Sequence, residues 1–419
     1  MKYALKCLSY IDESVSAFHA VMALEKRFLE AGFSQLREKE DWKLEEGGAY
    51  YVKRSESSIL AFRIPDRKPL GFSIAAAHSD SPTFKVKTNP DMTLECYAKL
   101  NTEPYGGMIY ASWLDRLLSV AGRVVYKGEN GPESKLVNID EDLLVIPNVA
   151  IHMEREMNKG FSYNPQTDLL PLWGTGTDLK LEEKVAEAAG LEPEDILGKD
   201  LFLYVREKGK LAGATKDLMV SPRLDDLSCA FALGESMTEA SPQNYIPVCA
   251  VFDHEEVGSG TERGAGSTFL QDTLKRIVLL LDGREETYYK WLAESFMISA
   301  DNAHALHPNH PEKADAGSKP VLNGGIVIKY HGGMKYTTDA YSEAVMKLLC
   351  KEAEVSYQTY QNRSDIAGGS TLGNVSSRLV SIPCVDIGLP QLAMHSAMET
   401  AGSRDVEDLI KVLNVFLGR

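Results

Sequence analysis

Apolar residues follow two different spacings in the first part of the chain. Before Gly32 they recur at steps of three and four residues, which places them on one face of an α-helix. Residues 50–54 and 58–63 carry strand signals, and residues 70–78 are continuously apolar up to a polar end. A run of that kind is expected of a strand that is buried on both faces of a sheet. The pattern therefore predicts a helix followed by the strands of a covered sheet.

A second pattern occupies residues 89–217, where short segments of Val, Ile and Leu are separated by Gly, Pro and Asn. This pattern predicts a β-rich region with one acidic helical stretch at residues 178–197. After Pro222 the chain returns to longer strands and helices in alternation, which favours a mostly parallel or mixed sheet covered by helices. We therefore predict a discontinuous α/β domain, residues 1–88 and 218–419, into which the β-rich domain is inserted.

The composition narrows the class of protein. The chain has 45 Lys and Arg against 60 Asp and Glu, a net charge of -15, which argues against a nucleic-acid partner because phosphate binding needs an excess of cations. No apolar run approaches the ~20 residues of a membrane-spanning helix, so no membrane partner is expected. The six cysteines are scattered without a CxxC pair, and no secretory signal is evident, which is typical of a cytoplasmic protein. The acidic residues must lie on solvated surfaces, in a metal site, or both.

Polar residues that bind metal ions in other proteins follow four predicted strands and begin one predicted helix. The strands deliver His78 with Asp80, Glu255 with Glu256, Asp301, and His395, and the helix begins with Asp225 and Asp226. In open α/β sheets, ligands bind outside the carboxyl ends of the strands. These side chains are therefore expected to converge although they are far apart in the sequence.

Imidazole and carboxylate ligands without a thiolate suit zinc, cobalt or manganese. Of the neighbours Glu255 and Glu256, one can bind a metal while the other takes a proton from a metal-bound water. The spacing of His78 and Asp80 fits a ligand whose second ring nitrogen is held by a carboxylate. Each signal alone is more often structural, and Asp226 in particular fits a helix N-cap. Their joint occurrence at the ends of elements favours a metal site.

Five segments of the sequence resemble the metal-site motifs of the aspartyl aminopeptidase family, which includes the yeast vacuolar aminopeptidase. The segments are AAAHSDSP, SPRLDDLSC, FDHEEVGSG, SADNAHALHPNHPEK and PQLAMHSAMET. Further similar segments lie near the N-terminus, at the start of the insert and before the last motif, so the resemblance runs nearly end to end. It implies a co-catalytic dinuclear zinc enzyme that releases N-terminal residues, typically acidic ones, from peptides. It also implies a homo-oligomer, commonly a tetrahedral dodecamer, with the insert mediating assembly.

Position by position, the resemblance assigns ligands to two zinc ions per subunit. His78 and Asp301 would bind one zinc, Glu256 and His395 the other, and Asp225 would bridge the two. Glu255 would be the general base, and Asp80 would orient His78. His152, in the segment IPNVAIHMERE, resembles a histidine that family members present to a neighbouring subunit's active site, although a surface histidine of a β-rich domain explains it equally well.

The substrate preference is left open by one departure from the family. Acid-specific relatives carry a lysine shortly before an RYxxN-like motif, whereas this chain has Gly333 near that position. A cation beside the side-chain pocket is what would select Asp or Glu, and Lys335 and Lys329 are the two lysines near enough in sequence to replace it. His304, His307 and His310 are interpreted as loop residues with at most a role in a substrate pocket.

Two alternatives to this function remain. One is another dinuclear zinc exopeptidase or deacylase, such as a glutamyl or deblocking aminopeptidase, and the contexts DHEEVGS and SPRLDD favour the aspartyl aminopeptidase family instead. The other is a catalytically silent assembly or cargo protein that kept the fold. Intact Glu255 together with every ligand type argues against it, because a site that has lost its activity usually loses one of these residues.

Overall fold

The computed structural model describes all residues 1–419 and divides into two compact units. The first comprises Met1–Asp80, Gly209–Met394 and Glu399–Arg419, and the second comprises Ser81–Lys208 and His395–Met398. These bounds differ from the predicted boundaries at residues 88 and 218. Strand β5 (Thr83–Leu94) runs across the first of them, and β12 (Lys210–Ala212) pairs with β13 (Leu218–Ser221) across the second. Backbone hydrogen bonds thus keep each of these strands within one unit.

The first unit is built on a nine-stranded sheet. Its strand order is β1 (Ser34–Leu36), β2 (Ala49–Arg54), β3 (Ser58–Arg63), β14 (Tyr245–Phe252), β4 (Gly71–His78), β15 (Phe296–Ala300), β19 (Cys384–Gly388), β17 (Ile326–Tyr330) and β18 (Tyr357–Gln361). The central strands β14, β4, β15 and β19 pair in parallel, whereas β2 with β3, β3 with β14 and β17 with β19 pair in antiparallel fashion. The predicted mixed α/β sheet is confirmed.

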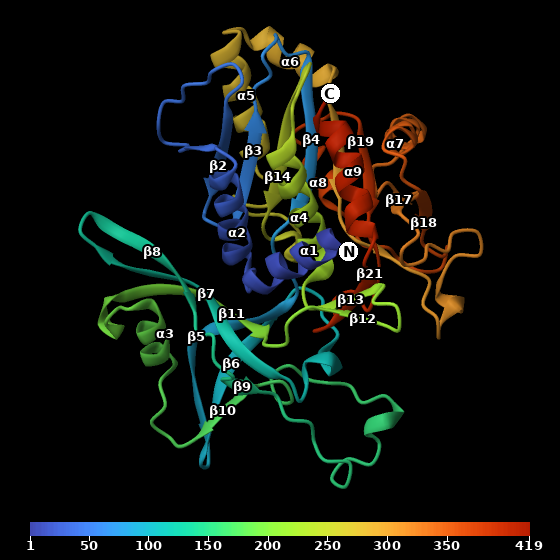
Figure 1. Ribbon diagram of the computed structural model, residues 1–419. Coiled ribbons are helices and arrows are strands. Elements are labelled where there is room, and N and C mark those ends of the chain that lie inside the picture. Colours follow the sequence, from blue (N-terminus) through green and yellow to red (C-terminus); the bar gives the residue numbers. More distant parts are fainter. The chain divides into compact units, whose positions relative to one another are not determined.

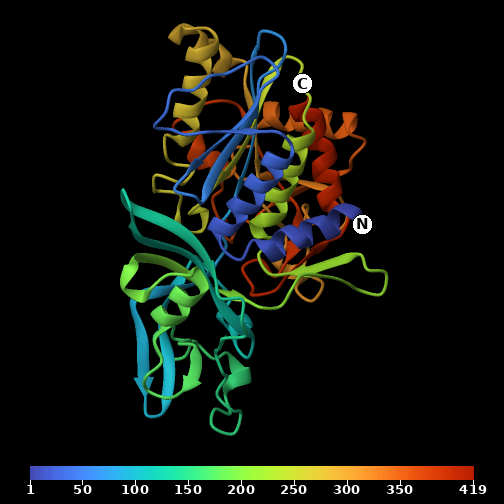
Figure 2. The ribbon, with the colours of Figure 1, turned by 60° about the vertical axis from the view of Figure 1, so that its left-hand side comes forward.

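Helices cover both faces of this sheet (Figures 1 and 2). In β4, Ala75 and Ala77 belong to one hydrophobic core, and Ile74 and Ala76 belong to the other, because successive side chains of a strand point to opposite faces. The first core is packed by α1 (Lys2–Glu13), α2 (Ala17–Glu30), α4 (Leu224–Glu239), α7 (Ala340–Glu352) and α9 (Asp405–Leu417). The second is packed by α5 (Phe269–Leu281), α6 (Glu285–Ala293) and α8 (Leu372–Ser376). No helix is long and apolar enough to cross a membrane.

The first unit also contains a smaller, five-stranded sheet. Two of its strands directly follow central strands of the large sheet in the sequence. Its order is β12, β13, β21 (Glu399–Gly402), β20 (Pro390–Leu392) and β16 (Ala303–His304). Strand β16 begins three residues after β15 ends, and β20 begins two residues after β19 ends. The small sheet therefore continues the chain past the carboxyl ends of β15 and β19, where functional residues were expected.

The second unit is a seven-stranded sheet that closes on itself. Its strands run in the order β11 (Ile196–Val205), β5, β6 (Tyr97–Tyr105), β10 (Leu172–Thr175), β9 (Leu144–Val145), β7 (Leu117–Gly128) and β8 (Gly131–Asn138). Closure follows because β11 pairs with both β5 and β7. The acidic stretch at residues 178–197, predicted to be helical, contains α3 (Leu181–Ala189), which packs Leu181 and Val185 into the core of this unit. The last two residues of the stretch belong to β11 instead.

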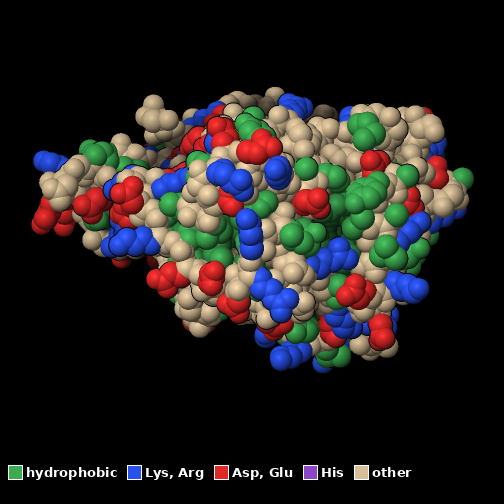
Figure 3. Space-filling model, turned by 90° about the horizontal axis from the view of Figure 1, so that it is seen from above, with side chains coloured by type: hydrophobic (Ala, Val, Ile, Leu, Met, Phe, Trp, Pro, Cys, Tyr) green, Lys and Arg blue, Asp and Glu red, His purple; other side chains and the backbone are tan.

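The acidic excess of the chain lies largely on the surface. On the face seen in Figure 3, acidic side chains are interspersed with Lys and Arg and do not form one continuous patch. Only a few carboxylates are fully buried, among them Asp80, Asp225, Asp226, Asp386 and Asp405. These few are the ones that need a specific partner, because a buried charge is costly unless it is paired or hydrogen-bonded.

Asp405 gives the first unit a testable dependence of stability on pH. Asp405 is the first residue of α9. Its carboxylate accepts hydrogen bonds from the backbone N–H groups of Asn323 (2.7 Å) and Gly325 (3.1 Å). Burial raises the pKa of Asp405 to about 7, although both hydrogen bonds oppose the shift. Between its ordinary pKa and about pH 7, the folded state holds a proton that the unfolded chain has released, so stability falls as pH rises through that window.

We therefore expect Asp405→Asn to be most destabilising at low pH relative to the wild type. The asparagine does not titrate, so the difference in unfolding free energy between the two proteins should narrow from pH 4 to pH 8 when both are unfolded in urea. A difference that stays constant or widens over this range would contradict the raised pKa of Asp405.

Candidate metal centre

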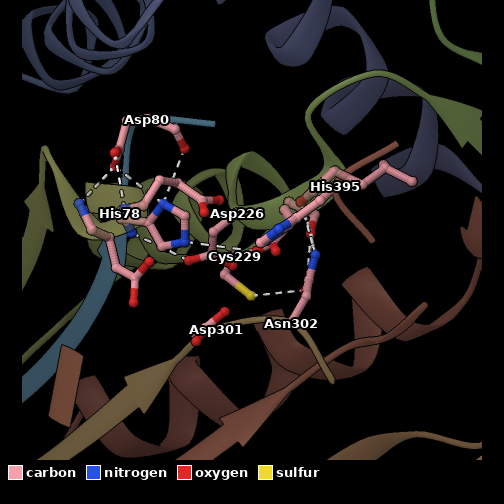
Figure 4. Close-up of polar contacts among 12 residues, drawn as sticks. His78, Asp80, Asp226, Cys229, Asp301, Asn302 and His395 are labelled. Atoms are coloured by element: carbon pink, nitrogen blue, oxygen red, sulfur yellow. Dashed lines mark hydrogen bonds and ion pairs between the residues drawn. The ribbon is translucent and has the colours of Figure 1, made fainter. Parts of the chain in front are cut away.

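His78 is the last residue of β4 and is almost completely buried (Figure 4). Its Nδ1 donates to the backbone oxygen of Asp80 (3.0 Å) and lies 3.4 Å from Asp80 Oδ1, while its Nε2 lies 3.6 Å from Asp225 Oδ1. Burial lowers the pKa of His78, but the interactions with the carboxylates of Asp225 and Asp80 outweigh it and raise the pKa well above the usual value. Because Nδ1 is held by Asp80, Nε2 is the ring atom that is presented to the neighbouring carboxylates.

Asp80 also fixes the turn that carries the two glutamates. Its Oδ1 accepts from the backbone N–H of Glu255 (3.1 Å), and its Oδ2 accepts from that of Glu256 (3.2 Å). Both glutamates lie in a short 3₁₀ helix, Glu255–Val257, which follows β14. The sequence predicted only that Asp80 orients His78, and the structure adds that it ties the end of β4 to the Glu255 turn.

The beginning of α4 contributes two buried carboxylates. The backbone at Asp225 and Asp226 is not helical, although both residues fall within the bounds of the helix. The backbone N–H of Asp225 donates to Glu399 Oε2 (3.0 Å), and Asp226 Oδ2 accepts from the backbone N–H of His78 (3.2 Å). The regular part of α4 begins after Asp226, so the interpretation of Asp226 as an N-cap stays a prediction, and the structure adds that its side chain belongs to the carboxylate cluster.

Asp301 follows β15 and is held by a buried lysine of β17. Lys329 Nζ lies 3.3 Å from Asp301 Oδ2 and donates to the backbone oxygens of Asp301 (2.7 Å) and Asn302 (3.2 Å). Burial raises the pKa of Asp301, and Lys329 opposes that shift while Asp225 adds to it. The ammonium group of Lys329 is thus engaged with a predicted metal ligand.

Ligand atoms from four parts of the chain converge at this edge of the sheet. Atoms of His78, Asp225, Asp226 and Asp301 lie within 4.8 Å of one another, and so do atoms of His78, Glu255 and Glu256. Burial raises the pKa of Asp226 well above its usual range; His78 opposes the shift, and the neighbouring carboxylates add to it. Asp226 Oδ1 is buried without a hydrogen-bond partner. A cation would satisfy this oxygen and offset the like charges, so the residues fit a metal site of the zinc, cobalt or manganese type.

Glu255, like Glu256, is only partly buried. Burial nevertheless raises its pKa to about 8; His78 opposes the shift, and the surrounding carboxylates add to it. A bound dication would lower this pKa again. A carboxyl group whose pKa is adjustable around neutrality suits proton transfer.

Three further predicted residues make contacts of their own. His395 is grouped with the second unit, where its Nδ1 donates to the Gly107 carbonyl oxygen (2.6 Å). His152 lies on an exposed turn of the same unit. Gly333 lies in the turn after β17, and the ammonium group of nearby Lys335 donates to the Gly368 carbonyl oxygen. The roles predicted for these residues stay predictions.

A buried amide next to Asp301 was missed by the sequence reasoning. Asn302 Nδ2 donates to the backbone oxygen of Leu224 (2.8 Å), to Ser228 Oγ (3.0 Å) and to Gln391 Oε1 (3.0 Å), and its Oδ1 lies 3.3 Å from Cys229 Sγ (Figure 4). These contacts fix the segment after β15, which carries Asp301, against α4. The only signal for Asn302 in the sequence was its position directly after Asp301.

A sheet whose parallel central strands bring together an imidazole and several buried carboxylates at their ends is the arrangement of a metal-dependent hydrolase. The family model described as "Aminopeptidase I zinc metalloprotease (M18)" matches residues 10–417. The chain therefore belongs to the M18 peptidase family, the aspartyl aminopeptidase family, as its motifs predicted, and it is a metalloaminopeptidase.

Individual relatives and solved structures agree with this family. The chain is 45% identical to "Probable M18 family aminopeptidase 2" of Clostridium novyi (strain NT), over 99% of this chain and 98% of that protein. It superposes with a TM-score of 0.96 on "Cryo-EM structure of the Ape4 and Nbr1 complex", at 35% identity, covering 99% of this chain and 85% of the other. Against "Structure of S. cerevesiae mApe1 dodecamer" the TM-score is 0.87 at 26% identity, covering 99% and 95%.

Proposed function

We propose that the protein hydrolyses the first peptide bond of peptides with a free N-terminus, using two zinc ions. The convergence of His78, Asp225, Asp226 and Asp301 in an M18 chain is the observation that carries this proposal. The proposed ligands are those that the motifs assign, namely His78, Asp225, Glu256, Asp301 and His395. Asp226 lies in the same cluster, where its negative charge would add to the attraction of the site for a cation. Cobalt or manganese would suit the same donor atoms.

Glu255 is proposed as the general base. Bound ions would polarise the scissile carbonyl group and lower the pKa of a water molecule. Glu255 accepts a proton from this water as its oxygen bonds to the carbonyl carbon, and then delivers the proton to the peptide nitrogen as the C–N bond breaks. The hydrogen bond from the Glu255 backbone to Asp80 holds the base beside His78 during both transfers.

The preference for the N-terminal residue is best tested with a panel of peptides and metal analysis of the same sample. We expect peptides that begin with Asp, Glu, Leu or Lys to be cleaved only when their amine is free, and N-acetylated versions to resist cleavage. Release of the acyl group from acetylated peptides would favour a deblocking enzyme or deacylase. No turnover of any peptide by fully metallated protein would favour the silent assembly protein.

We also propose that the protein is a homo-oligomer, with a dodecamer as the expected assembly. The proposal is supported by its similarity to the yeast structure that is described as a dodecamer. The β-rich unit is the proposed assembly domain. A cytoplasmic location is proposed because all six cysteines are free thiols and five of them are buried.

His152 is proposed to complete the active site of a neighbouring subunit. His152→Ala and Glu255→Gln should each impair turnover, and mixed oligomers of the two variants should regain activity. In a mixed assembly, some sites combine an intact Glu255 from one subunit with an intact His152 from another. Unchanged turnover by His152→Ala, or mixtures that are no more active than the separate variants, would contradict a shared site.

A further inference from the structure

The small five-stranded sheet of the first unit has no role in the mechanism described so far. Its strands β20 and β21 carry two polar side chains to which the motifs assign no role, Gln391 and Glu399. Gln391 is only 1% exposed and Glu399 only 2%. A polar side chain is costly to bury unless it is hydrogen-bonded, so the partners of these two residues indicate what they do.

Glu399 holds the backbone of a proposed metal ligand. Its Oε2 accepts the backbone N–H of Asp225 at 3.0 Å, near the beginning of α4. The N–H groups of a helix's first turn have no partner within the helix, and the backbone at Asp225 is not helical (φ -83°, ψ 110°). Strand pairing fixes the approach of Glu399, because it lies opposite Ser221 in the antiparallel pair β13–β21, four residues before Asp225. The small sheet thus supplies the acceptor for this N–H group.

Gln391 connects Glu399 to the segment that follows β15. Its Nε2 donates to Glu399 Oε1 at 3.5 Å, and its Oε1 accepts from Asn302 Nδ2 at 3.0 Å. Asn302 directly follows Asp301, another proposed ligand. Both ends of the Gln391 amide group are therefore engaged, one with the partner of Asp225 and the other with the neighbour of Asp301.

Asn302 closes this network on the beginning of α4. Its Nδ2 also donates to the backbone oxygen of Leu224 at 2.8 Å. The carbonyl oxygen of Leu224 and the N–H of Asp225 belong to the same peptide group. Asn302 therefore holds one polar end of this peptide group and Glu399 holds the other, and Gln391 joins the two side chains. The orientation of the peptide group at Asp225 is fixed from both sides.

The hydrogen bonds of this network have a fixed direction. A carboxylate has only acceptors, so Gln391 turns its NH2 group toward Glu399 and its carbonyl oxygen toward Asn302. Asn302 must then use its NH2 group as the donor to Gln391. The carboxylate thus determines the orientation of both amide groups, and exchanging an acceptor for a donor at either end of the Gln391 side chain would break the sequence of bonds.

We propose that Glu399, Gln391 and Asn302 are positioning residues that orient Asp225 for metal binding. They act through the Leu224–Asp225 peptide group and not on an ion or a peptide substrate. A ligand whose backbone is already held in place binds a metal more tightly, because less freedom is lost on binding. The inference rests on the proposed metal-dependent function, and it assigns the small sheet the role of supporting that site.

The test titrates the metal-free protein with cobalt, which suits the same donor atoms and whose visible absorption reports the arrangement of its ligands. Glu399→Gln should weaken cobalt binding about ten- to hundredfold, the usual cost of losing a group that orients a metal ligand. Glutamine keeps the shape of the side chain but cannot accept from both Gln391 and Asp225. At saturating cobalt, kcat should fall while KM for the peptide stays nearly unchanged, because the network acts on a ligand and not on the substrate.

A reciprocal exchange separates the direction of the hydrogen bonds from damage to the core. Gln391→Glu alone sets two carboxylates against each other and should also weaken cobalt binding. When Glu399→Gln and Gln391→Glu are combined, the carboxylate at position 391 can accept from Asn302 and from the amide at position 399. The oxygen of that amide can then accept from Asp225. The double variant should therefore bind cobalt more tightly than either single variant.

Glu235→Gln is the matched control. Glu235 is a buried carboxylate near the other end of α4, where it pairs with Lys6, so its replacement should leave the cobalt affinity unchanged. Thermal melting of the metal-free variants verifies that each is folded. Should Glu399→Gln not fold, Gln391→Met breaks both hydrogen bonds of Gln391 and leaves the carboxylate of Glu399 in place. It should weaken cobalt binding about two- to tenfold, as loss of a hydrogen bond would.

A cobalt affinity that is unchanged in Glu399→Gln and in Gln391→Met would overturn the proposal. A double variant that binds cobalt no more tightly than the single variants would also overturn it. Neither result affects the aminopeptidase function, which fails only if the metal-loaded wild-type protein cleaves no peptide.

Discussion

Replacing Glu255 by Gln is expected to lower kcat by about two to four orders of magnitude while the bound metal stays in place, because general bases contribute factors of this size. Glutamine has nearly the same shape but cannot accept the proton from the attacking water. The backbone N–H of residue 255 would still donate to Asp80, so the turn should keep its position. Steady-state kinetics and metal analysis of the same preparation measure both parts of the expectation.

A matched control for this substitution is Glu262→Gln. Glu262 lies in the same loop region but is exposed, and it contacts Ser55 and Arg263 rather than the carboxylate cluster. It should leave kcat nearly unchanged. If the Glu255→Gln protein lost its metal, Glu255 would be a metal ligand. If its kcat were unchanged, Glu255 would not be the general base.

Removal of the metal by a chelator is expected to abolish activity, and zinc or cobalt should restore it. The physical reason is the charge of the cluster: Asp225, Asp226 and Asp301 are held together beside His78, and Lys329 pairs with Asp301. Without a dication, protons must replace the metal, as the raised pKa of Asp226 indicates. The water and the carbonyl group then lose their activation.

The same treatment should lower the thermal stability of the protein, because a ligand that binds only the folded state stabilises it. The melting temperature should therefore fall on chelation and recover when metal is added back. Circular dichroism at the assay temperature verifies that the metal-free protein is still folded, so that lost activity is not lost structure. Undiminished turnover by a sample that metal analysis finds empty would refute the metal-dependent mechanism.

Most of the sheet could be predicted because its strands carry strong local signals. Strand β4 reads GFSIAAAH, and its continuous apolar run is explained by helices on both faces of the sheet. Helices α1 and α6 were not predicted. In α6, the polar and aromatic sequence EETYYKWLA shows little periodicity, and it buries only Thr287, Tyr288 and Trp291. Its helical state depends on what it packs against, which the local sequence does not contain.

The residues of the metal centre could be named from the sequence because each stands in a distinctive motif at the end of an element. His78, Asp225 and Asp301 were all selected in this way, and the fold brings them together. Asp226 was interpreted only as a helix cap, because an acid at the start of a helix is ordinarily one. Its burial and its contact with the His78 backbone depend on how α4 packs on β4, which connects residues almost 150 positions apart.

The sequence by itself thus determined the family, the α/β class and the chemical types of the ligands, because these depend on residue identity and local spacing. Only the tertiary structure decided which partner each charge has. It placed the Lys329 ammonium group beside the Asp301 carboxylate, and it placed the Asp80 carboxylate where it accepts the backbone N–H of Glu255. The reason is physical: the burial and pairing of a charged group are set by contacts between segments that are distant in the chain. These contacts determine the free energy of burying each charge, and with it the function that the group can have.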